Sequence, residues 1–391
     1  MVYDFSVEIP RENTSAIKLD KREAIFGNQN VIPMWVADMD FATAPFIIER
    51  LQKRLQHPIL GYTLQDDEYN SSIASWLKKR FGWDIDTSWL GFCPGIVAGL
   101  NHAVQAYTNP GDNVLIQTPV YHPFYHAIRQ NGRKLLSNPL ELVNGKYTIN
   151  FHDFEEKLKM GVKLFVLCSP HNPVGRVWTK EELTKMANLC LKHDVLIVSD
   201  EIHGDLVFNP NKHTPLASIA PDIADKTITF GSASKTFNIA GLATAWIVIS
   251  NPSLLKKYNL QAQRNGTWHG NVIGFEATKA AYSAQGEEWL SQLLTYLWSN
   301  YSLVKDFLKT ELPKIKLIEL EGTYLLWLDF REYNLSNEEL TDLLVSKAGV
   351  GFNAGDMFGV EGSGFQRMNI ACPAKTVQTV LERLKNTFAN L

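Results

Sequence analysis

Residues 227–242 read Thr-Ile-Thr-Phe-Gly-Ser-Ala-Ser-Lys-Thr-Phe-Asn-Ile-Ala-Gly-Leu, and this stretch is the strongest indication of the fold. Its first four residues have the composition of a strand that is buried on both faces. Most lysines are solvated surface charges, and that is the simplest alternative for Lys235. Lys235, however, follows a buried strand directly and precedes apolar Phe237, Ile239 and Leu242. A desolvated amine in such a place is a candidate nucleophile that forms a Schiff base with a carbonyl compound.

Other apolar runs with the same character lie on either side of this stretch, with helical patterns between them. The expected strands are Asn113–Gln117, Lys163–Cys168, Val195–Val198, Thr227–Phe230 and Ala245–Ile249. One helix is expected from Gly95 to the Asn-Pro-Gly of residues 109–111, and another begins at the capping box of Thr179–Glu182. Strands that alternate with helices at this spacing predict an α/β fold with a mainly parallel sheet.

Polar side chains stand directly after four of these strands. They are Tyr121, Asn172, Asp200, His203 and Lys235. Ligands of open α/β sheets bind beyond the carboxyl ends of the strands, so we expect these side chains to form one site. Asp200 is either a structural cap or a functional group. A buried carboxylate needs a cationic partner, and a protonated pyridine nitrogen would supply one.

The pattern of elements changes after residue 285. A long helix is expected first, followed by a strand at Tyr324–Phe330 and a helix that begins at the capping box of Ser336–Glu339. A last amphipathic helix carries Val377, Leu384 and Phe388. We therefore expect a large domain of residues 46–285 and a smaller α+β domain formed by residues 1–45 together with residues 286–391.

Composition limits the classes of function. The 391 residues are 45% hydrophobic and 20% charged, which is enough apolar material for a large core. The formal charge is −3 with no long run of one sign, so a nucleic-acid partner is not expected. The four cysteines form no C-x-x-C pair, as in proteins of a reducing compartment. No signal-peptide pattern and no long apolar run is visible, so we expect a cytoplasmic protein with no membrane partner.

Sequence motifs for metal binding and for nucleotide binding are weak or absent. His122 and His126 have the i, i+4 spacing of a metal pair, but Pro123 lies between them and no H-E-x-x-H motif occurs. No G-x-G-x-x-G follows a strand, and the chain contains no P-loop motif. A metal site is therefore not expected.

Taken together, the motifs resemble the fold-type I pyridoxal-phosphate enzymes of the class I and II aminotransferase superfamily. The motifs Asn172-Pro-x-Gly, Asp200-Glu-x-His203 and Ser232-x-Ser-Lys235 occur in the family's order and at its intervals, and Arg367 follows near the C-terminus. The segments that begin at Pro33, Ser234 and Gly364 are similar to the bacterial cysteine-S-conjugate or cystathionine β-lyase branch. The resemblance covers essentially the whole chain and implies pyridoxal 5'-phosphate as the cofactor.

The resemblance also implies roles for the residues of the site. Lys235 would hold the cofactor aldehyde as a Schiff base and, once free, remove the substrate α-proton. Asp200 would pair with the pyridinium nitrogen. Tyr121 would stack on the ring, and Asn172 would donate to its phenolic oxygen. Arg367 would bind the substrate α-carboxylate in a two-point contact. Without the resemblance, a core aromatic is the simpler interpretation of Tyr121, and a surface charge is the simpler interpretation of Arg367.

Phosphate binding is implied for the start of the helix at residue 95, where free N–H groups and the helix dipole favour an anion. The residues concerned are Gly95, Ile96, Val97, Ser232 and Ser234. Tyr62 stands where the family sends a tyrosine to the phosphate of the neighbouring subunit, which implies a homodimer with shared active sites. The alternatives are an ordinary helix start and a surface turn.

Two positions depart from the pattern of many aminotransferases. His203 stands in place of a tyrosine three residues after Asp200, and Ala243 stands in place of an arginine eight residues after Lys235. The first change alters hydrogen bonding near the phenolic oxygen, and the second removes a phosphate ligand. Both are compatible with the lyase branch.

The resemblance therefore predicts elimination of a thiol from cystathionine or a related cysteine-S-conjugate, giving pyruvate and ammonia. A thiolate is a good leaving group because the pKa of its conjugate acid is only about 8.5. An aminotransferase on the same scaffold and a regulatory binding protein with pyridoxal phosphate remain open alternatives. Trp35, Tyr125 and Trp268 are candidates for the pocket that receives the amino-acid thioether.

Overall fold

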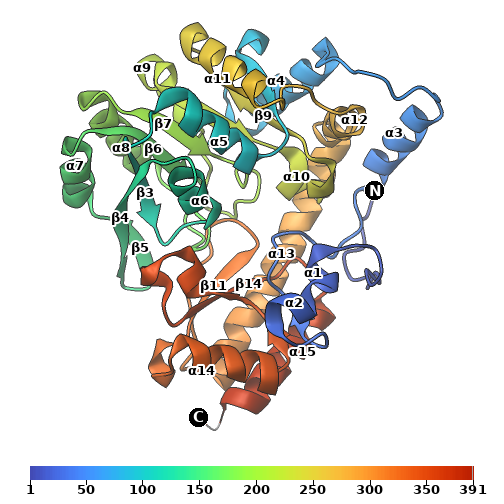
Figure 1. The fold of residues 1–391 in the computed structure, drawn as a ribbon. Helices are drawn as coiled ribbons and strands as arrows, with labels where there is room; N and C mark the ends of the chain where they lie inside the picture. The colour runs from blue at the N-terminus through green and yellow to red at the C-terminus, as the bar shows by residue number, and fades with distance from the viewer. Residues whose placement is uncertain (390) are drawn as a thin grey trace.

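An eight-stranded sheet with helices on both faces forms the larger part of the molecule (Figure 1). The computed structural model describes residues 1–389 and residue 391. From edge to edge the strands are β2 (Leu90–Cys93), β9 (Ala245–Val248), β8 (Thr227–Gly231), β7 (Leu196–Asp200), β6 (Val162–Cys168), β3 (Asn113–Thr118), β4 (Lys134–Val143) and β5 (Lys146–Ile149). The pairs from β4 through β3, β6 and β7 to β8 are all parallel, which confirms the expected α/β architecture.

One expected strand runs in the opposite direction to the parallel strands. β9 is antiparallel to both β8 and β2, and β5 forms an antiparallel hairpin with β4. The connection from β8 to β9 contains only the four-residue helix α10 (Ala233–Thr236) and a 3-10 turn. So short a helix does not carry the chain back along the sheet, as a parallel crossover requires.

The strands place alternate side chains on opposite faces of the sheet, so the sheet has a core on each face. One core includes side chains of α7 (Phe151–Lys159), α8 (Lys180–Lys192) and α9 (Pro221–Asp225). The other includes side chains of α5 (Ile96–Tyr107), α6 (Pro123–Arg129) and α11 (Pro252–Arg264). The expected helices after Gly95 and Thr179 are thus α5 and α8, and the Thr179 capping box is formed.

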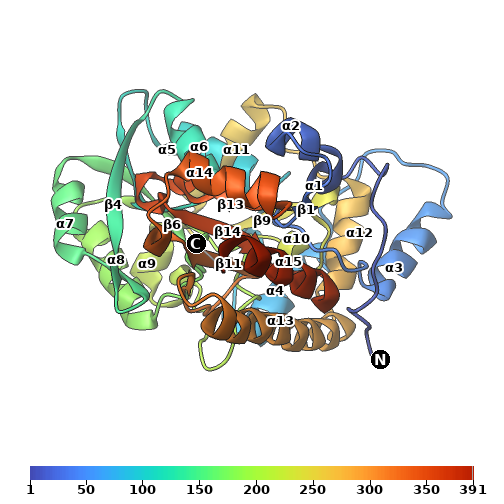
Figure 2. The same ribbon diagram turned by 90° about the horizontal axis from the view of Figure 1, so that it is seen from below.

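A smaller antiparallel sheet lies beside the C-terminal helices (Figure 2). Its strands, in order, are β10 (Lys316–Leu317), β11 (Leu325–Asp329), β14 (Phe365–Asn369) and β13 (Asn353–Ala354). The associated helices are α13 (Ala284–Glu311), α14 (Asn337–Asp342) and α15 (Ala374–Phe388). The 28 residues of α13 make a helix roughly 42 Å long. These elements confirm the expected strand and helices of the C-terminal region.

The N-terminal segment packs against this smaller sheet and α13. It contains α1 (Ile17–Asp20), α2 (Arg22–Phe26) and β1 (Ile32–Pro33). β1 pairs in parallel with β12 (Val350–Gly351), and the ring of Phe5 lies 5.6 Å from that of Trp289 in α13. We therefore propose that residues 1–45 and 286–391 form the small domain and residues 46–285 the large one.

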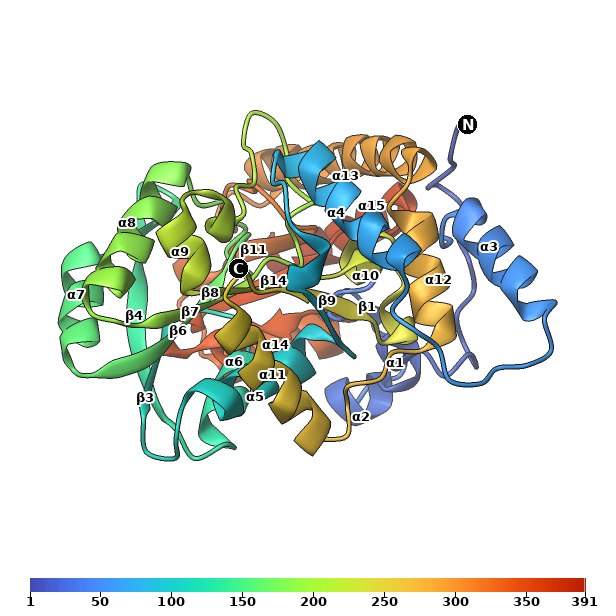
Figure 3. The same cartoon turned by 90° about the horizontal axis from the view of Figure 1, so that it is seen from above.

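Three helices form a group at one end of the large sheet. They are α3 (Pro45–Leu55), α4 (Asp67–Phe81) and α12 (Val272–Ala281). Figure 3 shows the connection from α3 to α4 as a long loop that bends away from the body of the molecule, and Tyr62 belongs to this loop. Across residues 1–389 and 391, no helix is long and apolar enough to cross a membrane.

Candidate functional site

The carboxyl ends of the parallel strands bring the predicted polar residues together. The N–H of Tyr121, which follows β3, donates to the carbonyl of Asn172, which follows β6, at 3.1 Å. Asp200 ends β7, and its charge acts on the pKa of Tyr121 and of Lys235 in α10. The sheet therefore places four of the predicted residues at one edge, as the strand pattern indicated.

Lys235 has a buried amine with one hydrogen-bond partner in the described part of the chain. Its Nζ donates to the carbonyl of Ala37 at 2.6 Å and forms no ion pair there. Burial and, to a smaller extent, the charge of Arg367 together lower the pKa of Lys235 to about 8, against the opposing effects of Asp38 and Asp200. A substantial fraction of the amine is therefore neutral near pH 8, which is the form that attacks a carbonyl carbon.

Asp200 is a buried carboxylate with no cation in ion-pair contact within residues 1–389 and 391. Only 5% of its surface is exposed, and it accepts the N–H of Ile202 at 3.2 Å. Burial raises the pKa of Asp200 to about 7, although this N–H and the charge of Lys235 act in the opposite direction. Such a carboxylate gains much from a bound cation, because the cost of its desolvation is already present.

His203 is buried three residues after Asp200. Its ring lies 6.0 Å from that of Tyr324, and its Nδ1 has no hydrogen-bond partner in the described structure. Burial and, to a smaller extent, the charges of Lys235 and Arg367 together lower the pKa of His203 to about 3. The imidazole is therefore neutral, and its free ring nitrogen is available to a ligand.

Arg367 projects from β14 of the small sheet into the same site. Its Nη1 donates to Asn172 Oδ1 at 3.0 Å, and its Nη2 donates to Asn353 Oδ1 at 2.6 Å and to the carbonyl of Trp35 at 2.9 Å. No carboxylate of a described residue pairs with it, and its Nε is buried without a partner. Burial lowers the pKa of Arg367 to about 10. The guanidinium is held by neutral oxygens and retains its capacity for an anion.

The start of α5 supplies free N–H groups near the ends of the strands. Gly95 is the N-cap residue, and no side chain caps the helix. The backbone of Gly95 contacts Cys93, and the pKa of Cys93 is affected by Asp200, so this helix start lies near the Asp200 carboxylate. The N–H groups of Ile96 and Val97 in this first turn have no intrahelical acceptor and are the kind of donors that bind an anion.

The two serines differ in their surroundings. Ser232 Oγ donates to the carbonyl of Thr244 at 2.7 Å and accepts the N–H of Ser234 at 3.0 Å, so it caps α10. This hydroxyl is already engaged in the fold. Ser234 is half-buried, and its hydroxyl has none of these bonds.

Sequence reasoning missed several members of the site. These are the Ala37 carbonyl, Tyr324, Asn353 and Asn369. Tyr324 Oη donates to the Ala37 carbonyl at 2.9 Å, and Asn369 Nδ2 donates to the neighbouring carbonyls of Val36 and Asp38. The buried strand around Tyr324 was visible in the sequence, but nothing in it pointed to this contact.

Some predicted residues lie apart from the site in a single chain. Tyr62 is 99% exposed, and Trp268 is half-exposed. Tyr125 Oη donates to the carbonyl of Phe358, at the contact between α6 and the small domain. Trp35 is half-buried, with its ring against Phe26, and it reaches Arg367 through its carbonyl.

The histidine pair at residues 122 and 126 lies close together, with ring centroids 5.8 Å apart. In the described part of the chain, no group of three or more His, Cys, Asp or Glu side chains is arranged to hold a metal ion.

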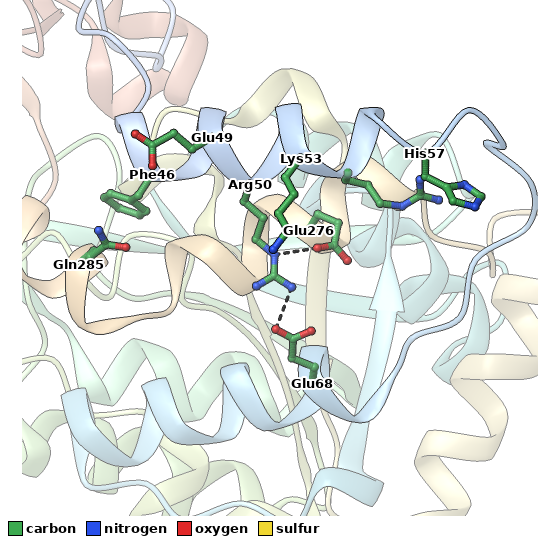
Figure 4. Close-up of a pocket in the computed structure, with 9 residues that line it drawn as sticks. Phe46, Glu49, Arg50, Lys53, His57, Glu68, Glu276 and Gln285 are labelled. Carbon is green, nitrogen blue, oxygen red and sulfur yellow. Dashed lines mark hydrogen bonds and ion pairs between the residues drawn. The ribbon is translucent and has the colours of Figure 1, made fainter.

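A surface hollow of about 850 Å³ lies away from Lys235, between α3, α4 and α12 (Figure 4). Its centre is Arg50, which bridges Glu276 of α12 and Glu68 of α4 with N–O distances of 2.7 and 2.8 Å. Lys279 adds ion pairs to Asp66 and Glu276. These contacts fasten both ends of the loop that carries Tyr62.

Comparison with known proteins identifies the family. The model of class I and II aminotransferases matches residues 29–384. The chain belongs to this family. Cystathionine beta-lyase PatB of Bacillus subtilis (strain 168) is 44% identical over 383 residues, covering 98% of this chain and 99% of that protein. Protein MalY of Escherichia coli (strain K12) is 35% identical over 391 residues, covering 99% of both chains.

Solved structures of the family have the same fold over the whole chain. Cystalysin from Treponema denticola, which contains a pyridoxal 5'-phosphate cofactor, superposes with a TM-score of 0.97 at 39% identity and covers 100% of both chains. The pyridoxal-phosphate-bound C-S lyase from Staphylococcus hominis has a TM-score of 0.93 at 36% identity and covers 99% of this chain and 98% of its own. These findings confirm the fold-type I transferase fold and the resemblance to the lyase branch.

The residues present fit pyridoxal 5'-phosphate. The site offers an amine of lowered pKa at Lys235, a buried carboxylate without a counter-ion at Asp200 and a free ring nitrogen at His203. It also offers the uncapped start of α5 for a phosphate. Within the described residues, none of these groups has the partner that one part of the cofactor would supply: a carbonyl carbon for the amine, a cation for the carboxylate and an anion for the helix start.

Proposed function

We propose that the protein is a pyridoxal-phosphate-dependent carbon-sulfur β-lyase, which eliminates a thiol from cystathionine or a related cysteine-S-conjugate and yields pyruvate and ammonia. The observation that carries this proposal is the 44% identity to a cystathionine beta-lyase over 98% of the chain. The unpaired charges at Lys235, Asp200 and Arg367 support it, because this reaction needs an amine, a carboxylate and a guanidinium in those roles.

When bound, the cofactor supplies an electron sink for the carbanion that forms at Cα. Lys235 would hold the cofactor, and its amine, when free, would be the base that takes the proton from the substrate Cα. Asp200 would hold a proton on the ring nitrogen, since a buried carboxylate that pairs with no cation of the described residues favours an ion pair there. Tyr121 orients the ring by stacking.

Arg367 and Asn172 position the substrate. Arg367 binds the α-carboxylate, and Asn172 fixes the guanidinium through its Oδ1 while its amide N–H groups remain free for the ring oxygen. The thiolate leaves from Cβ once Cα has lost its proton. His203, whose pKa is lowered to about 3, stays neutral throughout and adds no competing charge.

The decisive experiment supplies cystathionine to the purified, cofactor-loaded protein and quantifies pyruvate and thiol with and without a keto acid. We expect both products to form catalytically without the keto acid. Turnover that requires the keto acid and releases no thiol would establish an aminotransferase instead. Bound cofactor without activity on any amino acid would favour the regulatory binding protein. Borohydride reduction followed by peptide mapping should place the pyridoxyl group on Lys235.

The active site is proposed to be completed in a homodimer, with Tyr62 reaching the phosphate of the neighbouring chain. Its 99% exposed ring on a loop fastened at both ends supports this role, because an exposed tyrosine suits an interface. Mixing Tyr62→Ala and Lys235→Ala chains should restore about a quarter of the wild-type activity, since random reassortment gives that share of intact sites. No recovery despite chain exchange would refute a shared site.

A cytoplasmic location is part of the proposal. All four cysteines are free and buried, as expected of a protein that folds in a reducing compartment. Fractionation of cells that produce the protein, with its enzyme activity as the marker, tests this location.

A further inference from the structure

The Ala37 carbonyl is the common acceptor of two side chains in the site. Lys235 Nζ donates to it at 2.6 Å, and Tyr324 Oη donates to it at 2.9 Å. A carbonyl oxygen has two lone pairs, so these two donors occupy both of them. Because Lys235 has no other polar partner in the described structure, this oxygen sets the direction of its amine.

The backbone on either side of Ala37 is fixed from the small domain. Asn369 Nδ2 donates to the carbonyl of Val36 at 2.6 Å and to that of Asp38 at 2.7 Å. A rotation of the Ala37 carbonyl would move the two residues that carry these bonds, so Asn369 restrains it from both sides. The segment presents one fixed acceptor to the site.

Tyr324 is suited to hold this acceptor in place. It is fully buried, it immediately precedes β11, and its ring contacts the His203 ring. Burial raises the pKa of Tyr324 well above its usual value, so the hydroxyl stays protonated and remains a donor. Nothing in the reaction as described above uses this hydroxyl.

We propose that Tyr324 is a positioning residue for Lys235: its hydroxyl occupies one lone pair of the Ala37 carbonyl and leaves the other for the free lysine amine. The inference rests on the proposed function, in which that amine is released during each turnover and must stay near the substrate Cα. Tyr324 thereby fixes the position of the free Lys235 amine. It also limits the strength of the hydrogen bond between that amine and the Ala37 carbonyl.

Removal of the Tyr324 hydroxyl should change the pKa of Lys235 in one direction only. Lys235 faces the carboxylates of Asp38 and Asp200 and the guanidinium of Arg367, and its charge acts on the neutral His203. Removing the Tyr324 hydroxyl leaves these groups unchanged and makes the carbonyl a stronger acceptor for the ammonium form. Stronger hydrogen bonding to the charged form raises the pKa of an amine.

The test compares Tyr324→Phe with Tyr107→Phe. Tyr107 makes the same kind of bond, from its hydroxyl to the carbonyl of Leu254 at 2.8 Å, but it is the last residue of α5, at the opposite end of that helix from its start near Asp200. For thiol elimination by the holoenzyme, Tyr324→Phe should lower kcat about three- to tenfold and leave KM nearly unchanged. The acid limb of the kcat profile should move up by about 0.5 to 1 pH unit. Tyr107→Phe should change neither quantity.

A second measurement does not depend on the substrate. Competitive acetylation of the cofactor-free chain, followed by peptide mass mapping, reports the pH at which Lys235 becomes nucleophilic. Tyr324→Phe should raise that midpoint relative to the wild type and to Tyr107→Phe. If cystathionine is not cleaved, the proposed function fails while this measurement still tests Tyr324. An unchanged or lowered midpoint would overturn the inference.

A third variant tests the inference even if Tyr324→Phe does not fold. Incorporation of 3-fluorotyrosine at position 324 keeps the shape of the side chain and makes its hydroxyl a stronger donor. The acetylation midpoint of Lys235 should then move to lower pH, opposite to the effect of Tyr324→Phe. A shift in the same direction for both variants, or none for either, would show that the hydroxyl serves only the packing of the small domain.

Discussion

Two clusters of the molecule, each built around a buried carboxylate, contain the same kinds of charged groups but differ in whether those charges are paired. In the Glu321 cluster (Lys146, Arg176, Glu182 and Glu321), Glu321 receives Arg176 Nε and the N–H of Val177, each at 2.8 Å, and pairs with Lys146. In the active-site cluster (Asp200, Lys235 and Arg367), neither the carboxylate nor the guanidinium has a partner of opposite charge in the described structure.

The pKa values of the two carboxylates follow from this difference. Asp200 and Glu321 are 5% and 4% exposed, so burial raises the pKa of both. For Glu321, the bonds from Lys146, Val177 and Arg176 outweigh burial and bring the pKa below its usual value. For Asp200, the N–H of Ile202 and the charge of Lys235 do not outweigh burial, no ion pair forms with a described residue, and the pKa rises to about 7. A cluster that serves the fold satisfies its own charges, whereas the site leaves them for ligands.

The largest expected effect is the loss of activity when a residue of the active-site cluster is changed. Asp200→Asn should lower the rate of thiol elimination about a hundred- to a thousandfold, the size of effect that follows loss of one electrostatic stabiliser of a transition state. Cofactor retention should weaken as well. The measurement is initial-rate kinetics together with the cofactor absorbance after dialysis. An active Asp200→Asn enzyme would show that the ring nitrogen is stabilised by another group.

Loss of Glu321 should lower the stability of the fold and leave the activity nearly unchanged. Glu321→Ala leaves Arg176, only 2% exposed, with Glu182 as its remaining carboxylate partner. Breaking a buried pair of this kind destabilises a protein by about 3–5 kcal/mol. We expect a lower midpoint in urea unfolding and nearly unchanged activity per folded molecule. If the activity falls while the stability is unchanged, the Glu321 cluster does not serve the fold alone.

The two arginines that lie over phenylalanine rings sharpen the comparison. Arg367 lies 4.8 Å from the Phe358 ring centre, and Arg331 lies 4.6 Å from that of Phe365. Arg331 already has its carboxylate, Asp329, whereas Arg367 does not. Arg367→Lys should raise KM about ten- to a hundredfold, because an ammonium lacks the planar two-point contact.

The matched control for that substitution is Arg331→Lys, which should leave KM unchanged and lower stability only slightly. Equal kinetic effects of the two variants, measured by steady-state kinetics on cystathionine, would mean that Arg367 is not the carboxylate ligand.

The smallest expected effect is a pH dependence of the cofactor-free chain. Since the pKa of Asp200 is raised to about 7, its burial destabilises the folded chain increasingly from about pH 4 up to that value. Without cofactor, Asp200→Asn should therefore raise the melting temperature at pH 8 more than at pH 5. Glu321, with its lowered pKa, stabilises above about pH 4 and loses this contribution below it. Calorimetry of the variant and the wild type at both pH values is the test.

Several expectations from the sequence agree with the structure in detail. The predicted strands that end near Tyr121, Asn172, Asp200 and Lys235 are β3, β6, β7 and β8. Both predicted capping boxes are formed, at the starts of α8 and α14. The direction of β9 and the engagement of the Ser232 hydroxyl by Thr244 were not visible, because each depends on how the chain returns after α10.

The sequence by itself determined which residues stand at the ends of the parallel strands. Apolar runs, caps and motifs are local patterns that span a few residues, and strand polarity then brings Asn172, Asp200 and Lys235 to one edge. The tertiary structure alone decided the Ala37 acceptor, the Tyr324 donor and the Glu321 cluster. A backbone carbonyl has no signature in a sequence, and residues 145 positions apart, such as Arg176 and Glu321, are joined only by folding. Whether a buried charge is paired therefore depends on the folded chain, and that pairing sets its pKa.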